Sequence, residues 1–385
     1  MSHVEFIKAG ANDFEELVDL INLVFSNAVP TNFETLLPVQ YAERNFMSGT
    51  NYAVRENGRI VASVGSYPVD YRVCGNDLRI AGITAVAVHA RKRSKGYMKK
   101  LMDMALDDMR KDKIDFSFLY GLRQRYEYFG FTPCGTRFEF HFDKHNFQHY
   151  FGKDIGTGIT LKEVEAGDTE LFNKVKEIYN AESVNVVRPC ERFADVMSTW
   201  ECKTVAVYKD DRFIGYLSAE RNNESICEFF IDDVSLAGDV LYTFSEQFKR
   251  NHFSVSVFPY EYAMHSFLSK FADSVSVNKD GNFYVIDYLN TVESFLKLKC
   301  EYTKIPDGDV TLNIKNVGNL TIGISNNIPS VKFTDEKPDI DLTAIEASQL
   351  LFSQYSAFAL DSLEGNPFAR CLFPIPLFVR RLDRS

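Results

Sequence analysis

A basic turn lies between a strand-like segment and a helical repeat in the first third of the chain. Residues 83–88 read ITAVAV and are rich in β-branched residues, which is typical of a buried strand. The turn at 91–96 reads RKRSKG, and apolar residues then recur at spacings of three and four between Met98 and Met109, which predicts a helix. The first N–H groups of a helix lack intrahelical partners and carry the positive end of its dipole, so this unit can bind a phosphate. An ordinary turn with solvated basic side chains is the alternative interpretation.

The turn is basic, whereas the chain as a whole is acidic. Arg93 and Lys95 add positive charge, and Gly96 leaves the backbone open to close approach. The net charge of the 385 residues is −10. An acidic protein repels nucleic acid and anionic membranes, so we expect neither as a partner. An acidic balance is compatible with a cationic substrate such as an amine.

The aromatic run at residues 126–131, YEYFGF, is the second candidate for chemistry. A phenol has an ordinary pKa of about 10, so at neutral pH it holds its proton and can donate it. Tyr126 is therefore a candidate general acid, with Tyr120 and Tyr128 as rivals. The alternative is a ring that only packs beneath the basic turn. His89 follows the strand directly, and we interpret it as part of the local structure.

The cysteines and the start of the chain exclude several classes of protein. Seven cysteines are scattered and never form a Cys-x-x-Cys pair, so we expect neither a metal site nor a disulfide framework. The first 20 residues lack the pattern of a signal peptide. No apolar run approaches the roughly 18 residues of a spanning helix. These observations predict a cytoplasmic protein without a membrane segment.

The length allows two or three domains of about 100–200 residues. The first set of elements comprises a strand at 4–7, a helix from residue 14 and a hairpin around Asn57-Gly58, followed by strands at 69–73, 78–88 and 114–120. Beyond residue 140 the pattern restarts, and AVYKDDRFIGYL at 206–217 repeats AVRENGRIVASV at 53–64. The matching turn at 234–238 has no basic residue, so this second copy is predicted to lack an anion site. Two unrelated α/β stretches are the alternative.

The last third of the chain has a different character. A helix at 292–298, alternating strands at 310–314, 320–324 and 331–333, and a helix at 341–352 indicate an α+β unit. The tail from 371 reads CLFPIPLFVRRLDRS, in which Pro374 and Pro376 exclude a helix and the apolar residues favour burial.

Two motifs resemble those of the GNAT acetyltransferases. RSKGYM at 93–98 resembles the R/Q-x-x-G-x-G/A turn that binds the pyrophosphate of acetyl-CoA, although Met98 stands where Gly or Ala is usual. YEYFGF resembles the family's Y-x-x-F-G-Y/F segment. The α+β unit resembles the sterol-carrier-like third domain of the Eis-type acetyltransferases. This resemblance implies an α/β and α+β protein with a catalytic GNAT domain at 1–140, a second GNAT-like lobe without a coenzyme site at 141–288, and a sterol-carrier-like domain at 289–385 whose tail enters the active site.

The resemblance also implies the site. Acetyl-CoA is the expected co-substrate, with no metal, and Tyr126 is the expected general acid. The terminal carboxylate of Ser385 is the expected base, with Asp383 or a relayed water as alternatives. The expected coenzyme-binding residues are Val86, Ala87, Val88, Arg93, Ser94, Lys95, Gly96, Tyr97, Met98, Gly121 and Leu122.

The implied activity is transfer of an acetyl group to a primary amine of the aminoglycoside, polyamine or lysine type, by a homo-oligomer, either a hexamer or a dimer. One alternative is a non-catalytic protein that binds a CoA thioester or a lipid. Another is an acyltransferase with a longer acyl donor.

Overall fold

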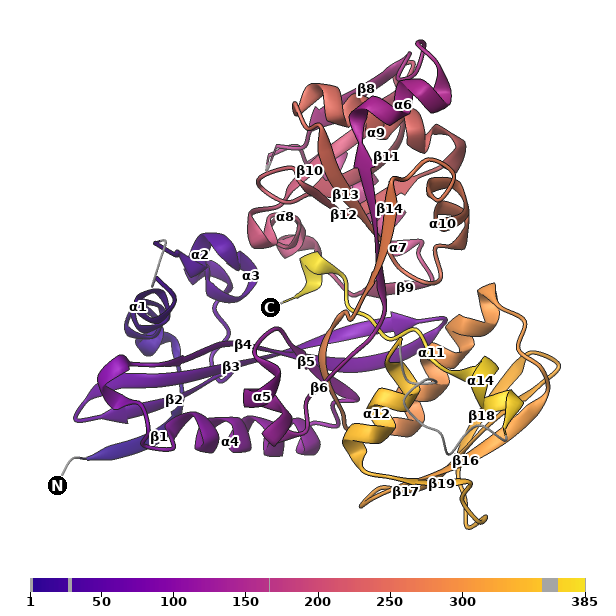
Figure 1. Ribbon diagram of the computed structural model, residues 1–385. Coiled ribbons are helices and arrows are strands. Elements are labelled where there is room, and N and C mark those ends of the chain that lie inside the picture. Colours follow the sequence, from indigo (N-terminus) through magenta and orange to yellow (C-terminus); the bar gives the residue numbers. More distant parts are fainter. Residues whose placement is uncertain (1–2, 27–29, 166, 355–365, 385) are drawn as a thin grey trace.

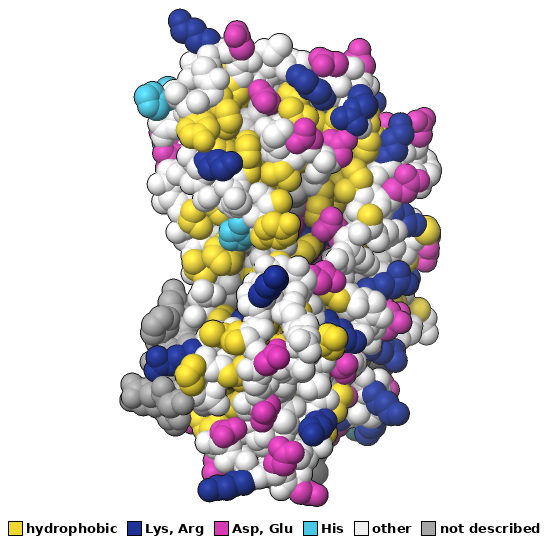
Figure 2. Space-filling view, turned by 90° about the vertical axis from the view of Figure 1, so that its right-hand side faces the viewer, with side chains coloured by type: hydrophobic (Ala, Val, Ile, Leu, Met, Phe, Trp, Pro, Cys, Tyr) yellow, Lys and Arg dark blue, Asp and Glu magenta, His cyan; other side chains and the backbone are white. Residues whose placement is uncertain are grey.

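A computed structural model describes residues 3–26, 30–165, 167–354 and 366–384. Three sheets organise the chain, one of eight strands, one of seven and one of four (Figure 1). No helix among the described residues is long and apolar enough to cross a membrane. On the face shown in Figure 2, acidic and basic side chains are interspersed and form no large patch of one sign.

The first sheet has the order β1-β2-β3-β4-β5-β15-β6, and β9 pairs with β3. Its strands are β1 Val4–Lys8, β2 Asn51–Glu56, β3 Arg59–Val73, β4 Asn76–Val88, β5 Phe116–Leu119, β6 Thr132–Cys134, β9 Val184–Val186 and β15 Gly281–Val285. Helix α1 (Phe14–Phe25) and helix α4 (Tyr97–Lys111) pack on opposite faces of this sheet (Figure 1). Two short helices, α2 (Phe33–Leu36) and α3 (Pro38–Tyr41), lie beside α1.

Local turn chemistry explains the start of this sheet. Asn57 and Gly58 both have positive φ, 51° and 81°, as the predicted tight hairpin requires. The segment at 69–73, predicted as a separate strand, continues β3 without a break. The methionine-containing stripe of α4 is buried against the sheet, which confirms the predicted packing face.

The second sheet has the order β14-β7-β13-β12-β11-β10-β8. Its strands are β7 Arg137–Asp143, β8 Ile159–Glu163, β10 Lys203–Lys209, β11 Arg212–Ala219, β12 Ser225–Ile231, β13 His252–Val257 and β14 Ser274–Asn278. Helices α6 (Lys144–Phe151), α9 (Ala237–Gln247) and α10 (Tyr262–Leu268) share one core with it, whereas α7 (Thr169–Asn180) and α8 (Phe193–Met197) share another. The hairpin of β10 and β11 and the parallel pair β12–β13 around α9 repeat the layout of the first sheet.

The third sheet has the order β18-β17-β16-β19. Its strands are β16 Gly308–Ile314, β17 Gly318–Ser325, β18 Ile328–Phe333 and β19 Ile340–Leu342, and its helices are α11 Tyr288–Tyr302, α12 Ala344–Phe352 and α14 Pro367–Leu372. Helix α12 begins with a capping box, because Thr343 and Glu346 bind each other's backbone N–H groups. One apolar core joins this sheet to the first.

Strand pairing crosses the predicted domain boundaries. Strand β15 lies within the predicted range 141–288, yet it pairs with β5 and β6 of the first sheet. Strand β9 from the same range pairs with β3. The division at residues 140 and 288 therefore stays a prediction, and the first sheet is completed by strands from later in the chain.

The tail lies between the first two sheets and ends near α8 (Figure 1). Its apolar side chains are buried, as predicted: Phe373, Ile375, Leu377, Phe378 and Leu382. Three of its charged side chains, Arg380, Asp383 and Arg384, are buried as well, and each has a charged partner. Arg380 Nη2 lies 3.0 Å from Glu261 Oε1, Asp383 Oδ1 lies 2.7 Å from Arg188 Nε, and Arg384 pairs with Asp280.

Candidate active site

Two parallel strands of the first sheet separate and open a cavity. Strand β4 pairs with β5 only at residues 80–82, opposite residues 116–118, and then runs on alone to Val88. A bulge bends β4 at this point, because the register with β3 shifts between Ser63 and Gly65 and Ala85 takes a left-handed φ of 45°. Backbone groups of β4 beyond Gly82 are thus left without a partner in β5.

The cavity between the separated strands has a volume of about 370 Å³. Residues 83–86 of β4 form one wall, and residues 119–122 after β5 form the other. A second cavity of about 350 Å³ adjoins it and shares Val86, Arg93 and Arg125 with it. Residues 92–99 of the basic turn line this second cavity. The sequence-predicted turn and the separated strands therefore form one continuous cleft.

The turn presents an open helix N-terminus to the cleft. Gly96 is the N-cap of α4 with φ of 75°, and no side chain caps the first N–H groups of the helix. A Cβ at Gly96 would meet no atom within 4 Å, so a side chain would fit there without a clash. The positive φ of this residue is what favours glycine. Helix amides without a capping side chain are free to donate to an anion.

The two predicted cations of the turn have different roles. Lys95 Nζ lies 2.9 Å from Glu56 Oε1, and Lys92 Nζ lies 3.1 Å from Glu56 Oε2. Lys95, followed by Lys92, holds the pKa of the buried Glu56 carboxyl below its ordinary value. Lys95 therefore braces the turn against β2. Arg93 is exposed and makes no hydrogen bond or ion pair with any residue that the structure describes. Arg93 is thus an available cation in a wall that the two cavities share.

The predicted coenzyme residues divide along β4 by strand alternation. Val86 and Val88 line the cavity at the turn, whereas Ala87 is buried in the core under α1. Ser94, Tyr97 and Met98 line the same cavity as Gly96. Gly121 and Leu122 line the cavity between the strands instead.

Tyr126 lies at the end of helix α5 (Arg123–Tyr126) and lines the cavity between the strands. Its ring packs on Gly121, where an added Cβ would lie 2.5 Å from Cε2. Burial raises the pKa of the Tyr126 phenol. Of the two rivals, Tyr120 lines the same cavity, but Tyr128 is 67% exposed outside it, with Lys99 Nζ 4.8 Å from its ring centroid. Tyr126 and Tyr120 are therefore the phenols that line the cavity between the strands.

His89 has a structural role. Its Nδ1 accepts a hydrogen bond of 3.2 Å from the backbone N–H of Arg91 and caps the short turn before α4. This agrees with its interpretation as local structure.

Trp200 is a cleft residue that the sequence analysis missed. It follows α8 in the second lobe, and its side chain lines the cavity beside Tyr126. Its indole Nε1 donates a hydrogen bond of 3.2 Å to the backbone carbonyl of Arg384. Trp200 is the only tryptophan in the sequence, but no local pattern indicates which cavity its ring reaches.

The two predicted sources of a base can be placed only in part. Ser385 lies outside the described residues. Asp383 is buried, and its oxygens bind Arg188 and the hydroxyl of Tyr179, at distances of 2.7–3.0 Å. It lines none of the described cavities around the cleft. Asp383 is therefore an anchor of the tail, and its place in the structure does not favour it as the base.

The second lobe has a cavity at the corresponding position. This cavity, of about 320 Å³, lies at the end of β12 and before α9, and it includes Glu182, Asp232 and Glu261 but no Lys or Arg among its described lining residues. A pyrophosphate would meet carboxylates there. The turn at 234–238 contains no basic residue, and the described residues that line the cavity beside it contain none either.

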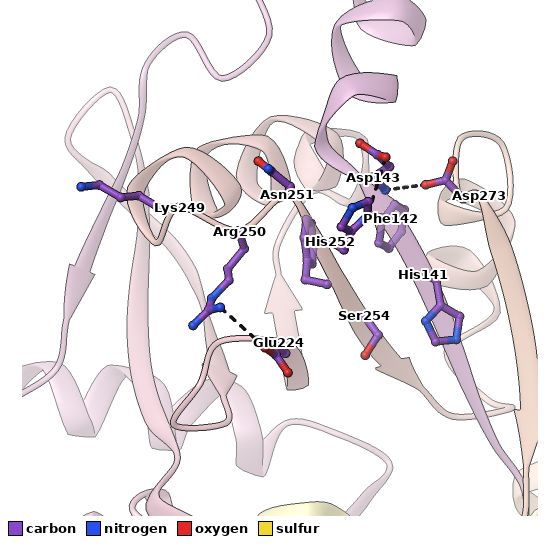
Figure 3. A pocket seen from close by; sticks show the side chains of 11 residues that line it. His141, Phe142, Asp143, Glu224, Lys249, Arg250, Asn251, His252, Ser254 and Asp273 are labelled. Carbon is purple, nitrogen blue, oxygen red and sulfur yellow. Dashed lines mark hydrogen bonds and ion pairs between the residues drawn. The ribbon is translucent and has the colours of Figure 1, made fainter.

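A further cavity, of about 720 Å³, lies at the opposite end of β12 (Figure 3). Two of its carboxylates already have partners, since Arg250 Nη1 lies 3.6 Å from Glu224 Oε1 and Asp273 accepts from the backbone N–H of Asp143. His141 and His252 extend from different strands and do not meet (Figure 3). Nowhere in the described chain do three His, Cys, Asp or Glu side chains converge as a metal site.

Comparison with known proteins agrees with this geometry. Residues 5–134 match the family described as "Acetyltransferase (GNAT) domain". Residues 5–134 thus form a GNAT acetyltransferase domain, and this domain family implies an acyl-CoA donor.

Solved structures match over the full length. A GCN5-related N-acetyltransferase from Kribbella flavida is 15% identical with a TM-score of 0.68, covering 100% of this chain and 99% of that one. A probable N-acyltransferase from Enterococcus faecalis is 17% identical with a TM-score of 0.68, covering 98% and 99%. Eis1 from Mycobacterium abscessus is 13% identical with a TM-score of 0.65, covering 100% and 99%. These matches confirm the predicted Eis-like fold class. No curated protein matches the sequence.

Proposed function

We propose that the chain transfers an acetyl group from acetyl-CoA to a primary amine in the cavity between β4 and β5. The observation that carries this proposal is the continuity of the cleft. An uncapped helix N-terminus with an unpaired arginine opens directly into a cavity that contains a buried phenol. The turn would bind the anionic part of the coenzyme, and the adjoining cavity would hold the thioester next to the proton donor.

The basic turn would hold the pyrophosphate of the coenzyme. The amides at the start of α4 and the guanidinium of Arg93 are the donors, and Lys95 fixes the turn through Glu56. The separated part of β4 would supply backbone groups to the pantetheine arm and to the thioester carbonyl, where an N–H can stabilise developing negative charge. Val86 and Val88 lie where such contacts are needed.

Tyr126 would donate a proton to the departing thiolate. Because burial raises its pKa, the phenol stays protonated at neutral pH and is available as an acid. Holding amine and thioester together can supply about 7–11 kcal/mol of the barrier reduction in well-oriented cases. The residues of the cleft walls would provide that alignment.

The terminal carboxylate of Ser385 is the proposed base. Support comes from its neighbour, since the Arg384 carbonyl is bound by Trp200, a residue of the cleft wall. An α-carboxyl has an ordinary pKa of about 3.3–3.7 and is ionised at neutral pH. It could therefore accept the amine proton or orient a water that does so.

The test is thiol release from acetyl-CoA against a panel of primary amines. Amine-dependent release, with formation of the N-acetyl product, is expected. Tight acetyl-CoA binding without release for any amine would favour a binding protein, and preference for long-chain acyl-CoA would favour the alternative acyl donor. Light scattering would test the predicted dimer or hexamer.

A further inference from the structure

Aromatic side chains form the part of the cleft wall that faces away from the basic turn. Phe25 and Phe33 come from α1 and α2, Tyr120 follows β5, and Trp200 comes from the second lobe. Phe25 is 42% exposed and Tyr120 is 37% exposed. The described residues that line this cavity include only three with clearly polar side chains besides the tyrosines, namely Thr84, Arg93 and Arg125. Exposed aromatic faces in a concave site suit a flat apolar ligand.

The aromatic wall is held in place rather than loosely exposed. Trp200 and Glu201 both have left-handed φ angles, 59° and 55°, which are uncommon for residues other than glycine. The indole N–H is already bound to the Arg384 carbonyl, so the ring offers its face and edge to a ligand rather than a donor. Phe25 and Phe33 support each other, with ring centroids 5.0 Å apart. Stacking is therefore the interaction that this wall can provide.

The charge around the cavity is positive. Arg93 and Arg125 line it, and no Asp or Glu occurs among its described lining residues. Behind the aromatic wall, the guanidinium of Arg381 lies 4.7 Å from the centroid of the Trp200 ring, and that of Arg384 lies 4.4 Å from the Tyr120 ring.

A neighbouring cavity, which shares Tyr120 and Gly121 with this one, contains three carboxylates among its described lining residues, and each is already paired. Arg137 Nη2 lies 2.9 Å from Glu139 Oε1, Arg381 Nε lies 3.3 Å from Glu220 Oε1, and Asp280 pairs with Arg384. A ligand with several positive charges would meet repulsion in the cleft and find no free carboxylate in these described walls. A single amine is compatible with this field, because positive surroundings favour the neutral, nucleophilic form.

From these observations we infer that the acetyl acceptor is a monoamine attached to an aromatic ring by a short chain, with the ring stacked among Phe25, Tyr120 and Trp200. Phe33 is only 4% exposed and supports Phe25. The described walls of the cavity offer a polycation no carboxylate besides the one proposed for Ser385, so aminoglycosides and polyamines should be poorer acceptors than such a monoamine. This inference rests on the proposed acetyl transfer and narrows its substrate class.

The test compares kcat/KM for 2-phenylethylamine and tryptamine with hexylamine, spermidine and kanamycin, by thiol release from acetyl-CoA. We expect the aromatic monoamines to exceed hexylamine by about tenfold, as one good aromatic contact allows. Spermidine and kanamycin should be slower still. A polyamine or aminoglycoside with kcat/KM equal to or above that of the aromatic amines would overturn the inference.

Single-residue variants distinguish a loss of stacking from a general loss of protein structure or activity. Phe25→Ala should raise KM for tryptamine about tenfold while leaving KM for acetyl-CoA unchanged, and Trp200→Phe should retain most of the preference. Tyr262→Ala removes an exposed aromatic side chain at the second lobe's cavity and should change neither KM. An equal effect of Phe25→Ala on hexylamine and tryptamine would contradict stacking.

Binding is measured in parallel so that the two proposals can fail separately. Each amine is titrated into the protein saturated with CoA. Selective binding of aromatic amines without turnover would refute acetyl transfer and keep the inferred ligand class. Turnover with selectivity for polyamines would keep acetyl transfer and refute the ligand class.

Discussion

The indole N–H of Trp200 donates to the backbone carbonyl of Arg384 across 3.2 Å. This contact joins the second lobe to the last described residue of the chain at the wall of the cleft. The tail reaches this point because its own charged residues are bound on the way, Arg380 by Glu261 and Asp383 by Arg188. The three regions of the chain thus meet at one cavity, although the GNAT family match covers only residues 5–134.

The position of the chain's end can be tested by extending it. Two glycines added after Ser385 would move the terminal carboxylate without changing any described residue. If that carboxylate is the base, kcat should fall by about 10²–10⁴, the usual contribution of general acid–base catalysis. KM for acetyl-CoA should stay the same. The same extension at the N-terminus is the control, and an unchanged kcat for the C-terminal extension would exclude the terminal carboxylate.

Tyr126→Phe tests the proton donor. It should lower kcat by about 10²–10⁴ with little change in the binding of acetyl-CoA. The wild-type rate should persist at pH values below the Tyr126 pKa and fall above it, and burial moves that pKa upward from about 10. The alkaline limb should therefore be absent through pH 9. Tyr128→Phe, in an exposed ring outside the cavity, should have no effect. If Tyr120→Phe lowers kcat and Tyr126→Phe does not, the roles of the two phenols are reversed.

Arg93→Ala tests the anion site at the turn. Loss of a charged hydrogen bond of about 1.5–3 kcal/mol should raise KM for acetyl-CoA roughly 10- to 100-fold. Arg93→Lys should recover part of the loss, because a lysine keeps the charge but not the planar fork. Arg91→Ala is the matched control, since Arg91 is exposed but does not line the cavity. Equal effects of the Arg91 and Arg93 changes would indicate a diffuse field rather than a binding site.

Asp383→Ala tests whether Asp383 anchors the tail or acts as the general base. Removal of one partner from the buried group of Asp383, Arg188 and Glu228 should cost about 3–5 kcal/mol of folding free energy. Urea unfolding would measure this loss. Asp383→Asn, which keeps the shape and part of the hydrogen bonding, should recover some stability. A large fall in kcat with no loss of stability would instead assign Asp383 to the chemistry.

Local patterns predicted two features of the first sheet and its helix correctly. The Asn57-Gly58 turn and the repeat from Met98 to Met109 are encoded within a few residues, and both take the expected form. Gly96 also lies where the motif requires. These features depend on backbone angles and side-chain periodicity, which neighbouring residues determine.

Features that depend on distant contacts could not be predicted in this way. Strand β15 pairs with β5, which lies about 160 residues earlier in the chain. Nothing in the sequence of β15 indicates with which strand it pairs. Lys95 was expected to face a phosphate, but its ion pair with Glu56 joins segments 39 residues apart. Trp200 reaches the cleft only because the second lobe packs beside the first. Pairing and packing of this kind are set by the whole chain rather than by local sequence.

The most direct test of the account is a crystal structure of the protein with acetyl-CoA. The account predicts that the pyrophosphate lies on the amides at the start of α4 beside Arg93, with the thioester in the cavity that holds the Tyr126 hydroxyl. Coenzyme bound elsewhere, or a turn whose amides make no contact with it, would contradict the account.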